Sequence, residues 1–161
     1  MNCAKDDILL TVEDLKVHFT KKRSTLLKAA SKIHAVDGVS FKVRRGTTFG
    51  LVGESGSGKT TTALAVVKLV RLTSGRINLA GVDIESLNDK SMRKYRRNMQ
   101  MVFQDPYSSL NPRLRAGIIV RQPLDRLNVG EVDWREERVD ELLKLVGLLP
   151  EHKALFPHQF S

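Results

Sequence analysis

The chain has 161 residues, of which 41% are hydrophobic, enough for one domain or part of one. Its one cysteine, Cys3, excludes an internal disulfide or a cysteine metal cluster and is typical of a reducing compartment. The net charge of +9 favours partners rich in phosphate. No apolar run is long enough to cross a membrane, and Met1–Asp7 lacks a signal-peptide pattern, so a cytoplasmic protein is expected.

Two strands are predicted near the start of the chain. Apolar and polar residues alternate over Ile8–Phe19, which is typical of a half-buried strand. Residues 20–32 are polar and basic and predict an exposed loop. A second strand is predicted over Ala35–Val43, and the turn Arg44–Gly46 ends it.

A glycine-rich loop follows a short apolar segment. Residues 53–60 read Gly-Glu-Ser-Gly-Ser-Gly-Lys-Thr and fit the phosphate-loop pattern G-x-x-x-x-G-K-[ST]. Glycines let the backbone N–H groups turn toward phosphate oxygens, and Lys59 adds a compact cation. The flanks predict a buried strand over Thr47–Val52 and a helix over Thr61–Val70, the order that this loop requires. The sequence therefore predicts a site for a nucleoside triphosphate, with Mg²⁺ on the Thr60 hydroxyl.

Shorter elements are predicted after the first helix. Turn residues mark a hairpin of residues 76–79 against 82–84. A short basic helix is expected over 91–97, followed by a strand over 99–103. The basic cluster 93–97 is compatible with nucleic-acid binding, but no aromatic-rich strand or recognition-helix pattern accompanies it. A solvated helix face is the expected role, and no nucleic-acid partner is predicted.

The last third of the chain predicts helices. Residues 115–128 predict one helix interrupted at Pro123, and Asp133–Val146 predicts another. In the second helix, Asp133 is the expected N-cap with Glu136 three residues on, and Gly147 the expected end. One face of it is apolar and predicts packing, through Val139, Leu142, Leu143 and Val146. Residues 150–161 are expected to be irregular.

Gln104 is a second candidate site residue. It follows the predicted strand 99–103 and opens a proline-rich loop over residues 104–112. Its amide could coordinate Mg²⁺ or orient an attacking water. A solvent-facing loop glutamine is the alternative, and the residue alone does not decide between them.

Taken together, four segments resemble the ATP-binding subunit of ABC transporters, in the oligopeptide/dipeptide importer branch. They occur in the family's order, at residues 35–41, 50–60, 101–112 and 156–161. The resemblance implies ATP and Mg²⁺ as cofactors, with Gln104 as the Q-loop glutamine and Phe19 stacking on adenine. The implied nucleotide-binding residues are Phe19, Gly53, Ser55, Gly56, Ser57, Gly58, Lys59, Thr60, Thr61 and Gln104, with Thr60 and Gln104 on the metal.

The resemblance also implies an architecture and partners. The expected fold class is α/β, an incomplete P-loop NTPase core with an antiparallel β subdomain and the start of the helical subdomain. Residues 1–103 would form the β subdomain and the core, and residues 104–161 the Q-loop and helical subdomain. Residues 21–32 would be an insertion. The implied partners are membrane-embedded permease subunits and a second ATP-binding subunit, identical or different, which would hold the chain at the inner face of the membrane.

The chain departs from the family at its end. Members continue past the position of Ser161 with Gly-Gly-Gln, a strand ending in Asp-Glu and a switch histidine. The acidic residues Asp83 and Asp140-Glu141 lack the four-residue apolar strand that such a pair follows. We therefore expect an N-terminal fragment with no catalytic residue of its own, which binds ATP-Mg weakly without hydrolysing it. Exposed sheet edge and apolar surface are expected as well.

Two alternatives remain open from the sequence. The chain could be a non-enzymatic nucleotide-binding or docking module, which uses its helical region to contact a membrane partner. It could also be another phosphate-loop protein, such as a kinase or a GTPase. The absence of an Asn-Lys-x-Asp base-reading sequence weakens the GTPase interpretation.

Overall fold

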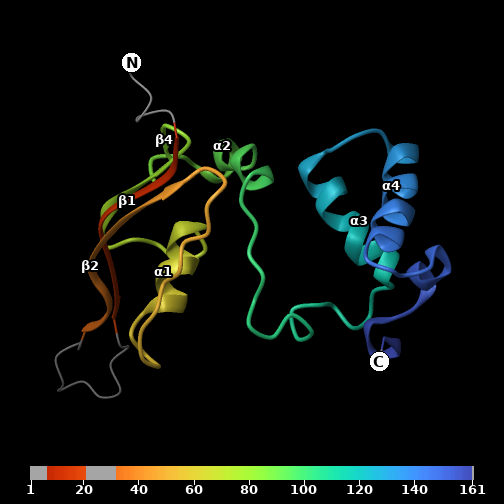
Figure 1. Cartoon of the computed structure of the whole chain (residues 1–161), viewed down its shortest axis with the longest axis horizontal. Coiled ribbons are helices and arrows are strands. Elements are labelled where there is room, and N and C mark those ends of the chain that lie inside the picture. Colours follow the sequence, from red (N-terminus) through yellow and green to blue (C-terminus); the bar gives the residue numbers. More distant parts are fainter. Residues whose placement is uncertain (1–6, 21–31, 161) are drawn as a thin grey trace. The chain divides into compact units, whose positions relative to one another are not determined.

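The computed structural model describes residues 7–20 and 32–160. The chain divides into two compact units between Met92 and Arg93 (Figure 1). This boundary lies before the predicted division at residues 103 and 104, which would separate the β subdomain and core from the Q-loop and helical subdomain. The division at 103 and 104 remains a prediction. Cys3 and residues 21–31 of the predicted insertion lie outside the described residues.

The first unit contains a four-stranded antiparallel sheet in the order β2-β1-β3-β4. β1 (Ile8–Thr20) pairs with β2 (Lys32–Arg44) on one side and with β3 (Ser74–Leu79) on the other. β4 (Val82–Asp83) completes a hairpin with β3. The two long strands and the hairpin predicted from the sequence are confirmed. Alternation along the strands places apolar side chains in the core, and a bulge between Val12 and Leu15 shifts the alternation of β1 by one residue. The buried side chains include Val12, Leu15, Val17, Val36 and Ile77.

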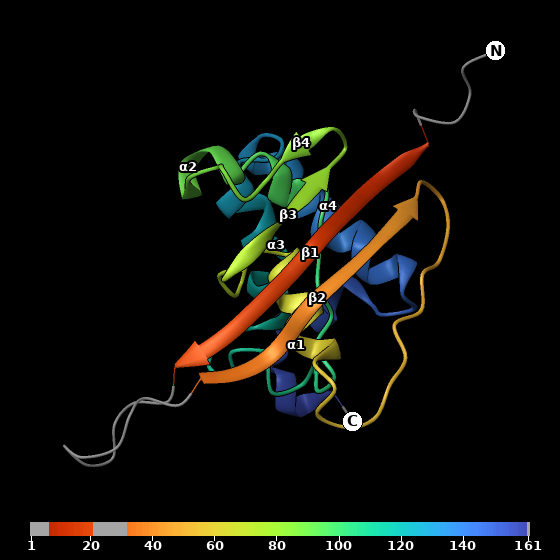
Figure 2. The same ribbon diagram turned by 90° about the vertical axis from the view of Figure 1, so that its left-hand side faces the viewer.

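Helix α1 (Lys59–Val66) lies against one face of this sheet (Figure 2). Its buried residues are Thr62 and Ala65. A helix is thus confirmed where one was predicted over residues 61–70, but it begins two residues earlier and ends four residues earlier. It ends because Lys68 adopts a left-handed backbone with φ of 55°, which cannot continue a right-handed helix.

The side chain of Lys68 anchors the end of α1. Its Nζ donates to three carbonyl oxygens, those of Ile84 and Glu85 at 2.8 Å and that of Leu87 at 2.6 Å. The ammonium group has three donors, and these carbonyls match them in number. The segment after β4 is therefore tied to the end of α1, ahead of the short helix α2 (Asp89–Met92).

Two predicted strands are wrong. Residues 47–52 and 99–103 are irregular and pair with no strand among the described residues. A strand is stabilised by hydrogen bonds to a neighbour, and no described segment supplies one here. The apolar side chains that a parallel sheet would bury are instead exposed, to 91% at Val52 and 84% at Val102. The expectation of exposed apolar surface is confirmed.

The second unit is helical. It contains the 3₁₀ turn η1 (Tyr95–Arg97), α3 (Ala116–Leu127), α4 (Val132–Leu145), η2 (Pro150–Ala154) and η3 (Pro157–Gln159). The predicted basic helix over 91–97 is therefore divided between the end of α2 and η1. The predicted interruption of α3 is wrong, because the helix runs through Pro123. Pro123 is exposed, and the loss of one backbone hydrogen bond there is tolerated.

Helix α4 is confirmed, with a different start. Its N-cap position is Glu131, and the predicted cap, Asp133, lies in the first turn, where its charge favours the positive helix end. Val139 and Leu143 are buried as predicted, whereas Val146 is 69% exposed because the helix ends just before it. Gly147 follows with φ of 79°, so glycine ends the helix as expected.

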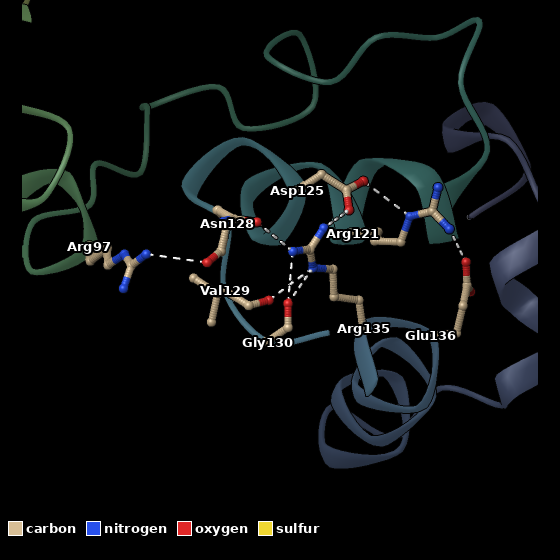
Figure 3. A network of polar contacts seen from close by, with 8 residues as sticks. All are labelled: Arg97, Arg121, Asp125, Asn128, Val129, Gly130, Arg135 and Glu136. Atoms are coloured by element: carbon tan, nitrogen blue, oxygen red, sulfur yellow. Dashed lines mark hydrogen bonds and ion pairs between the residues drawn. The ribbon is translucent and has the colours of Figure 1, made fainter. Parts of the chain in front are cut away.

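A guanidinium group holds the turn between α3 and α4 (Figure 3). Arg135 donates to the carbonyls of Val129 and Gly130, at 2.9 Å and 2.7 Å for the shortest contacts, and to Asn128 Oδ1 at 2.9 Å. Its Nη1 also pairs with Asp125 Oδ1 at 3.1 Å. The Arg135 side chain is only 11% exposed. One side chain therefore satisfies the carbonyls of both Val129 and Gly130.

Arg121 and Arg97 extend this network. Arg121 pairs with Asp125 of α3 and Glu136 of α4, and the charge of Glu136 raises the pKa of the guanidinium. Arg97 donates to the carbonyl of Leu127 at 2.6 Å and to that of Asn128 at 3.3 Å, which joins η1 to the end of α3. Figure 3 draws the bond to Asn128. Among the described residues, no helix has both the length and the apolar character that a membrane crossing requires.

Candidate nucleotide-binding site

The phosphate loop is an irregular segment that leads directly into α1. Residues 53–58 are neither helix nor strand, and Lys59 and Thr60 begin the helix. Gly56 and Gly58 have φ of 80° and 89°, a left-handed conformation that glycine adopts without a steric penalty. Ser57 N–H donates to the Glu54 carbonyl at 3.2 Å and closes a tight turn. The segment therefore has the curved backbone that the sequence motif predicts.

Gly58 is pressed against strand β2. A Cβ atom at this position would lie 2.2 Å from the carbonyl oxygen of Ala35 and 3.3 Å from Val36 Cγ2. A separation this short from a backbone oxygen excludes any side chain. The loop is thus seated on β2, and the sheet positions the first residue of α1.

We expect Gly58→Ala to destabilise the first unit by about 3 kcal/mol, because a left-handed alanine costs about 1–2 kcal/mol and the contact with Ala35 adds to it. Gly56→Ala is the matched control, since its φ is similar but its Cβ would meet no described atom within 4 Å. Hydrogen–deuterium exchange of the β1 and β2 amides measures the difference. Equal protection in the two variants would contradict the seating of Gly58 on β2.

The ammonium group of Lys59 lies over the loop that precedes it. Its Nζ donates to the carbonyls of Gly53 at 2.8 Å and Glu54 at 2.5 Å, and lies 3.3 Å from Ser57 Oγ. These oxygens come from both sides of the turn, so one positive charge holds the loop closed. A phosphate entering the loop would meet this charge at once.

The start of α1 is suited to an anion. Gly58 occupies the N-cap position, and no described side chain caps the helix. The first turn, Lys59-Thr60-Thr61, holds no acidic residue to offset the positive end of the helix dipole. Thr60 is exposed, whereas Thr61 is half-buried. Unsatisfied N–H groups and a partial positive charge therefore meet at the mouth of the loop.

Phe19 lies near the end of β1, where it pairs with Ile33 of β2 and is 43% exposed. The phosphate loop is drawn in the lower part of the first unit, as are the end of β1 and the start of β2, and Figure 2 shows the loop and the strand ends on opposite sides (Figures 1 and 2). An exposed aromatic face at the end of β1 suits a flat base. Its role in stacking on adenine remains a prediction.

Gln104 belongs to the second unit, in an exposed loop. The turn after it is ordered by Asp105, whose Oδ1 accepts a hydrogen bond from Ser108 N–H at 3.2 Å. That hydrogen bond lowers the pKa of Asp105 below its usual value. The structure brings residues 53–61 together, whereas the placing of Gln104 beside them remains a prediction.

Tyr107 is a residue of this loop that the sequence reasoning missed. Its hydroxyl donates to the Pro157 carbonyl at 2.5 Å, and its oxygen also lies 2.5 Å from the Phe160 carbonyl. The loop is therefore tied to residues some fifty positions further along the chain. No local pattern signals a contact over that separation.

The acidic residues rejected as catalytic substitutes make structural contacts. Asp140 pairs with Lys153 at 2.8 Å, and Glu141 pairs with Arg138 at 2.7 Å. Asp83 Oδ1 accepts the N–H of Glu85 at 3.0 Å in the turn after β4. The expectation that none of these side chains is a catalytic base remains a prediction.

The fold and the loop define a protein of the phosphate-loop class. The profile of the ABC transporter family matches residues 36–161. The chain belongs to the ABC transporter family.

Comparison with curated relatives identifies the branch of the family that this chain resembles. The oligopeptide transport ATP-binding protein AppF of Bacillus subtilis (strain 168) is 40% identical over 162 aligned residues, covering 100% of this chain and 49% of AppF. The di/tripeptide transport ATP-binding protein DppF of Pseudomonas aeruginosa (strain UCBPP-PA14) is 39% identical, covering 96% and 48%. The chain spans about half the length of these curated relatives. The predicted resemblance to the oligopeptide and dipeptide branch is confirmed.

A dimeric ATP-binding cassette, solved in a post-hydrolysis state bound to ADP and Pi, is similar in structure. It is 26% identical, with a TM-score of 0.77, over 95% of this chain and 63% of that one. The predicted fold class, an incomplete P-loop NTPase core with an antiparallel β part and a helical part, is confirmed.

Proposed function

We propose that this chain binds ATP with Mg²⁺ as part of the energy-coupling subunit of a peptide importer. The observation that carries the proposal is the loop 53–58, closed over by Lys59 and leading into an uncapped helix start. The names of the relatives AppF and DppF support peptide transport. The cassette bound to ADP and Pi supports a nucleotide as the ligand.

The residues fit the triphosphate group of ATP. Backbone N–H groups of the loop and of the first turn of α1 would donate to phosphate oxygens, with Ser55 and Ser57 at the loop surface. Lys59 would exchange the carbonyls of Gly53 and Glu54 for the outer phosphates, which carry full negative charge. The first turn supplies the Thr60 and Thr61 hydroxyls.

The Mg²⁺ ion would neutralise charge between the outer phosphates. Thr60 is proposed as one of its ligands, because its hydroxyl belongs to an exposed residue in the first turn of α1. The Gln104 amide is proposed as the other. Phe19 is proposed to stack on adenine, through the exposed ring at the end of β1.

The partners are proposed from the same family membership. A second ATP-binding subunit, identical or different, would pair with this one, and permease subunits would hold both at the inner face of the membrane. The dimeric cassette supports the pairing. No nucleic acid is proposed as a partner.

The isolated 161-residue polypeptide is expected to bind Mg-ATP, to prefer it to Mg-GTP, and to release no phosphate over multiple turnovers. The third expectation rests on the sequence, in which Asp83 and Asp140-Glu141 lack the four-residue apolar strand that a catalytic acidic pair follows. Equilibrium binding with a fluorescent ATP analogue, with ATP and GTP as competitors, measures the first two. A coupled phosphate-release assay measures the third.

Each outcome has a separate meaning. Absence of ATP binding by a folded chain would contradict the proposed function. Equal competition by GTP would contradict ATP specificity and favour another class of phosphate-loop protein. Sustained phosphate release that disappears in Lys59→Ala would contradict the expected lack of turnover.

A further inference from the structure

Three side chains that commonly bind metals meet on the β1–β2 pair. The strand register places His18 opposite His34. Asp37 lies three residues further along β2, beyond a register shift between Val17 and His18. His18 Nε2 is 3.4 Å from Asp37 Oδ1, and His34 Nδ1 is 3.4 Å from Asp37 Oδ2. The two imidazole rings stack with centroids 3.9 Å apart. One nitrogen of each histidine and one carboxylate oxygen lie within 4.8 Å of one another.

These distances suit a tetrahedral ion. Zinc bonds of about 2.0–2.2 Å place neighbouring ligands of a tetrahedron about 3.3–3.5 Å apart. Each histidine nitrogen lies at such a separation, 3.4 Å, from one oxygen of Asp37: His18 from Oδ1 and His34 from Oδ2. With a single carboxylate oxygen as the ligand, the three ligand atoms lie within 4.8 Å of one another, so small side-chain shifts are needed to close the site. To aim their lone pairs at one ion, the stacked rings would have to rotate about their Cβ–Cγ bonds. This rotation costs little energy, because the χ2 torsion of histidine is broad.

The surroundings also favour an ion. His18 has a side chain 15% exposed, and its Nε2 atom is buried without a hydrogen-bond partner in the described part of the chain. His34 and Asp37 are 53% and 56% exposed, so an ion and a water ligand can reach them. Lys16, opposite Asp37 in the register, is paired with Asp14 at 3.4 Å.

We propose that His18, His34 and Asp37 form a binding site for a divalent transition metal of the zinc class, with water as the fourth ligand. Two imidazoles and one carboxylate are the ligand set that such ions prefer. Mg²⁺ prefers oxygen ligands, so this site is distinct in chemistry from the one proposed at Thr60.

The site would reinforce the support of the phosphate loop. His34 and Asp37 flank Ala35 and Val36, the residues that Gly58 is seated on. An ion joining them to His18 would fasten this segment of β2 to β1. The sequence reasoning missed the site, because the two histidines become neighbours only through strand pairing.

The test is a titration of the nucleotide-free 161-residue chain with Co²⁺, followed by displacement with Zn²⁺. Tetrahedral Co²⁺ absorbs visible light strongly, so the spectrum reports both binding and geometry. One ion per chain is expected. His34→Ala and Asp37→Asn should each weaken binding by more than about 100-fold, the upper end of what loss of an outer-shell partner produces.

His158→Ala is the matched control, since His158 is an exposed histidine of the second unit. It should leave the Co²⁺ spectrum and affinity unchanged. Asp37→Asn keeps the shape of the side chain, and a thermal melt without metal verifies that each variant is folded. The proposal is overturned if the unaltered chain gives no tetrahedral spectrum, or if both site variants bind Co²⁺ as tightly as it does.

Discussion

Replacing Lys59 by alanine is expected to weaken Mg-ATP binding by about 100-fold. Two charge-assisted hydrogen bonds to phosphate oxygens contribute about 1.5 kcal/mol each, and about 3 kcal/mol corresponds to about 100-fold in affinity. The structure supplies the reason for two bonds, since Lys59 Nζ already donates to two carbonyls of the loop. Competition with a fluorescent ATP analogue measures the change.

Lys42→Ala is the control for charge, because Lys42 is an exposed lysine of β2 in the same unit. Lys42→Ala should change the affinity for Mg-ATP by less than about twofold, because salt screens surface charges that are distant from the site. Lys59→Arg keeps the charge and separates a loss of charge from a loss of shape. An unchanged affinity in a folded Lys59→Ala chain would remove Lys59 from the proposed site.

Arg135→Ala is expected to lower the free energy of unfolding of the second unit by about 3 kcal/mol. The substitution leaves several polar groups of the α3–α4 turn without a partner, at about 1–3 kcal/mol for each group that stays buried. These groups include the carbonyls of Val129 and Gly130. Asp125 loses one of its two arginine partners as well.

Urea denaturation followed by tryptophan fluorescence measures this change in the second unit alone. The single tryptophan, Trp134, lies on α4 beside Gly130. Arg138→Ala is the matched control, since it removes an arginine of the same helix with one exposed ion pair, to Glu141. Its expected effect is below about 1 kcal/mol. Equal effects of the two substitutions would show that Arg135 does not hold the turn.

The sequence predicted what depends on neighbouring residues. Alternation over 8–19 and 35–43 defines β1 and β2, because a half-buried strand shows its period locally. The phosphate loop follows from fixed positions, with glycine where Gly56 and Gly58 require a left-handed backbone. Gly147 marked the end of α4 for the same reason.

Most of the errors concern contacts between residues that are distant along the chain. Residues 47–52 and 99–103 have strand-like composition, but a strand also needs a neighbour, which composition does not supply. Arg135 and Tyr107 act through carbonyls of a turn and of η3, whose positions the sequence does not reveal. The cap of α4 was predicted two residues too late, at Asp133 instead of Glu131. Helix ends are uncertain by one or two residues when only the sequence is known.

The three carbonyls held by Lys68 have a mechanical consequence for α1. With its far end fixed, the helix cannot absorb a disturbance at its first turn by unravelling from the last one. Because α1 contacts β1 and β2, we expect a displacement of its first turn, as on filling of the loop, to be passed to these two strands.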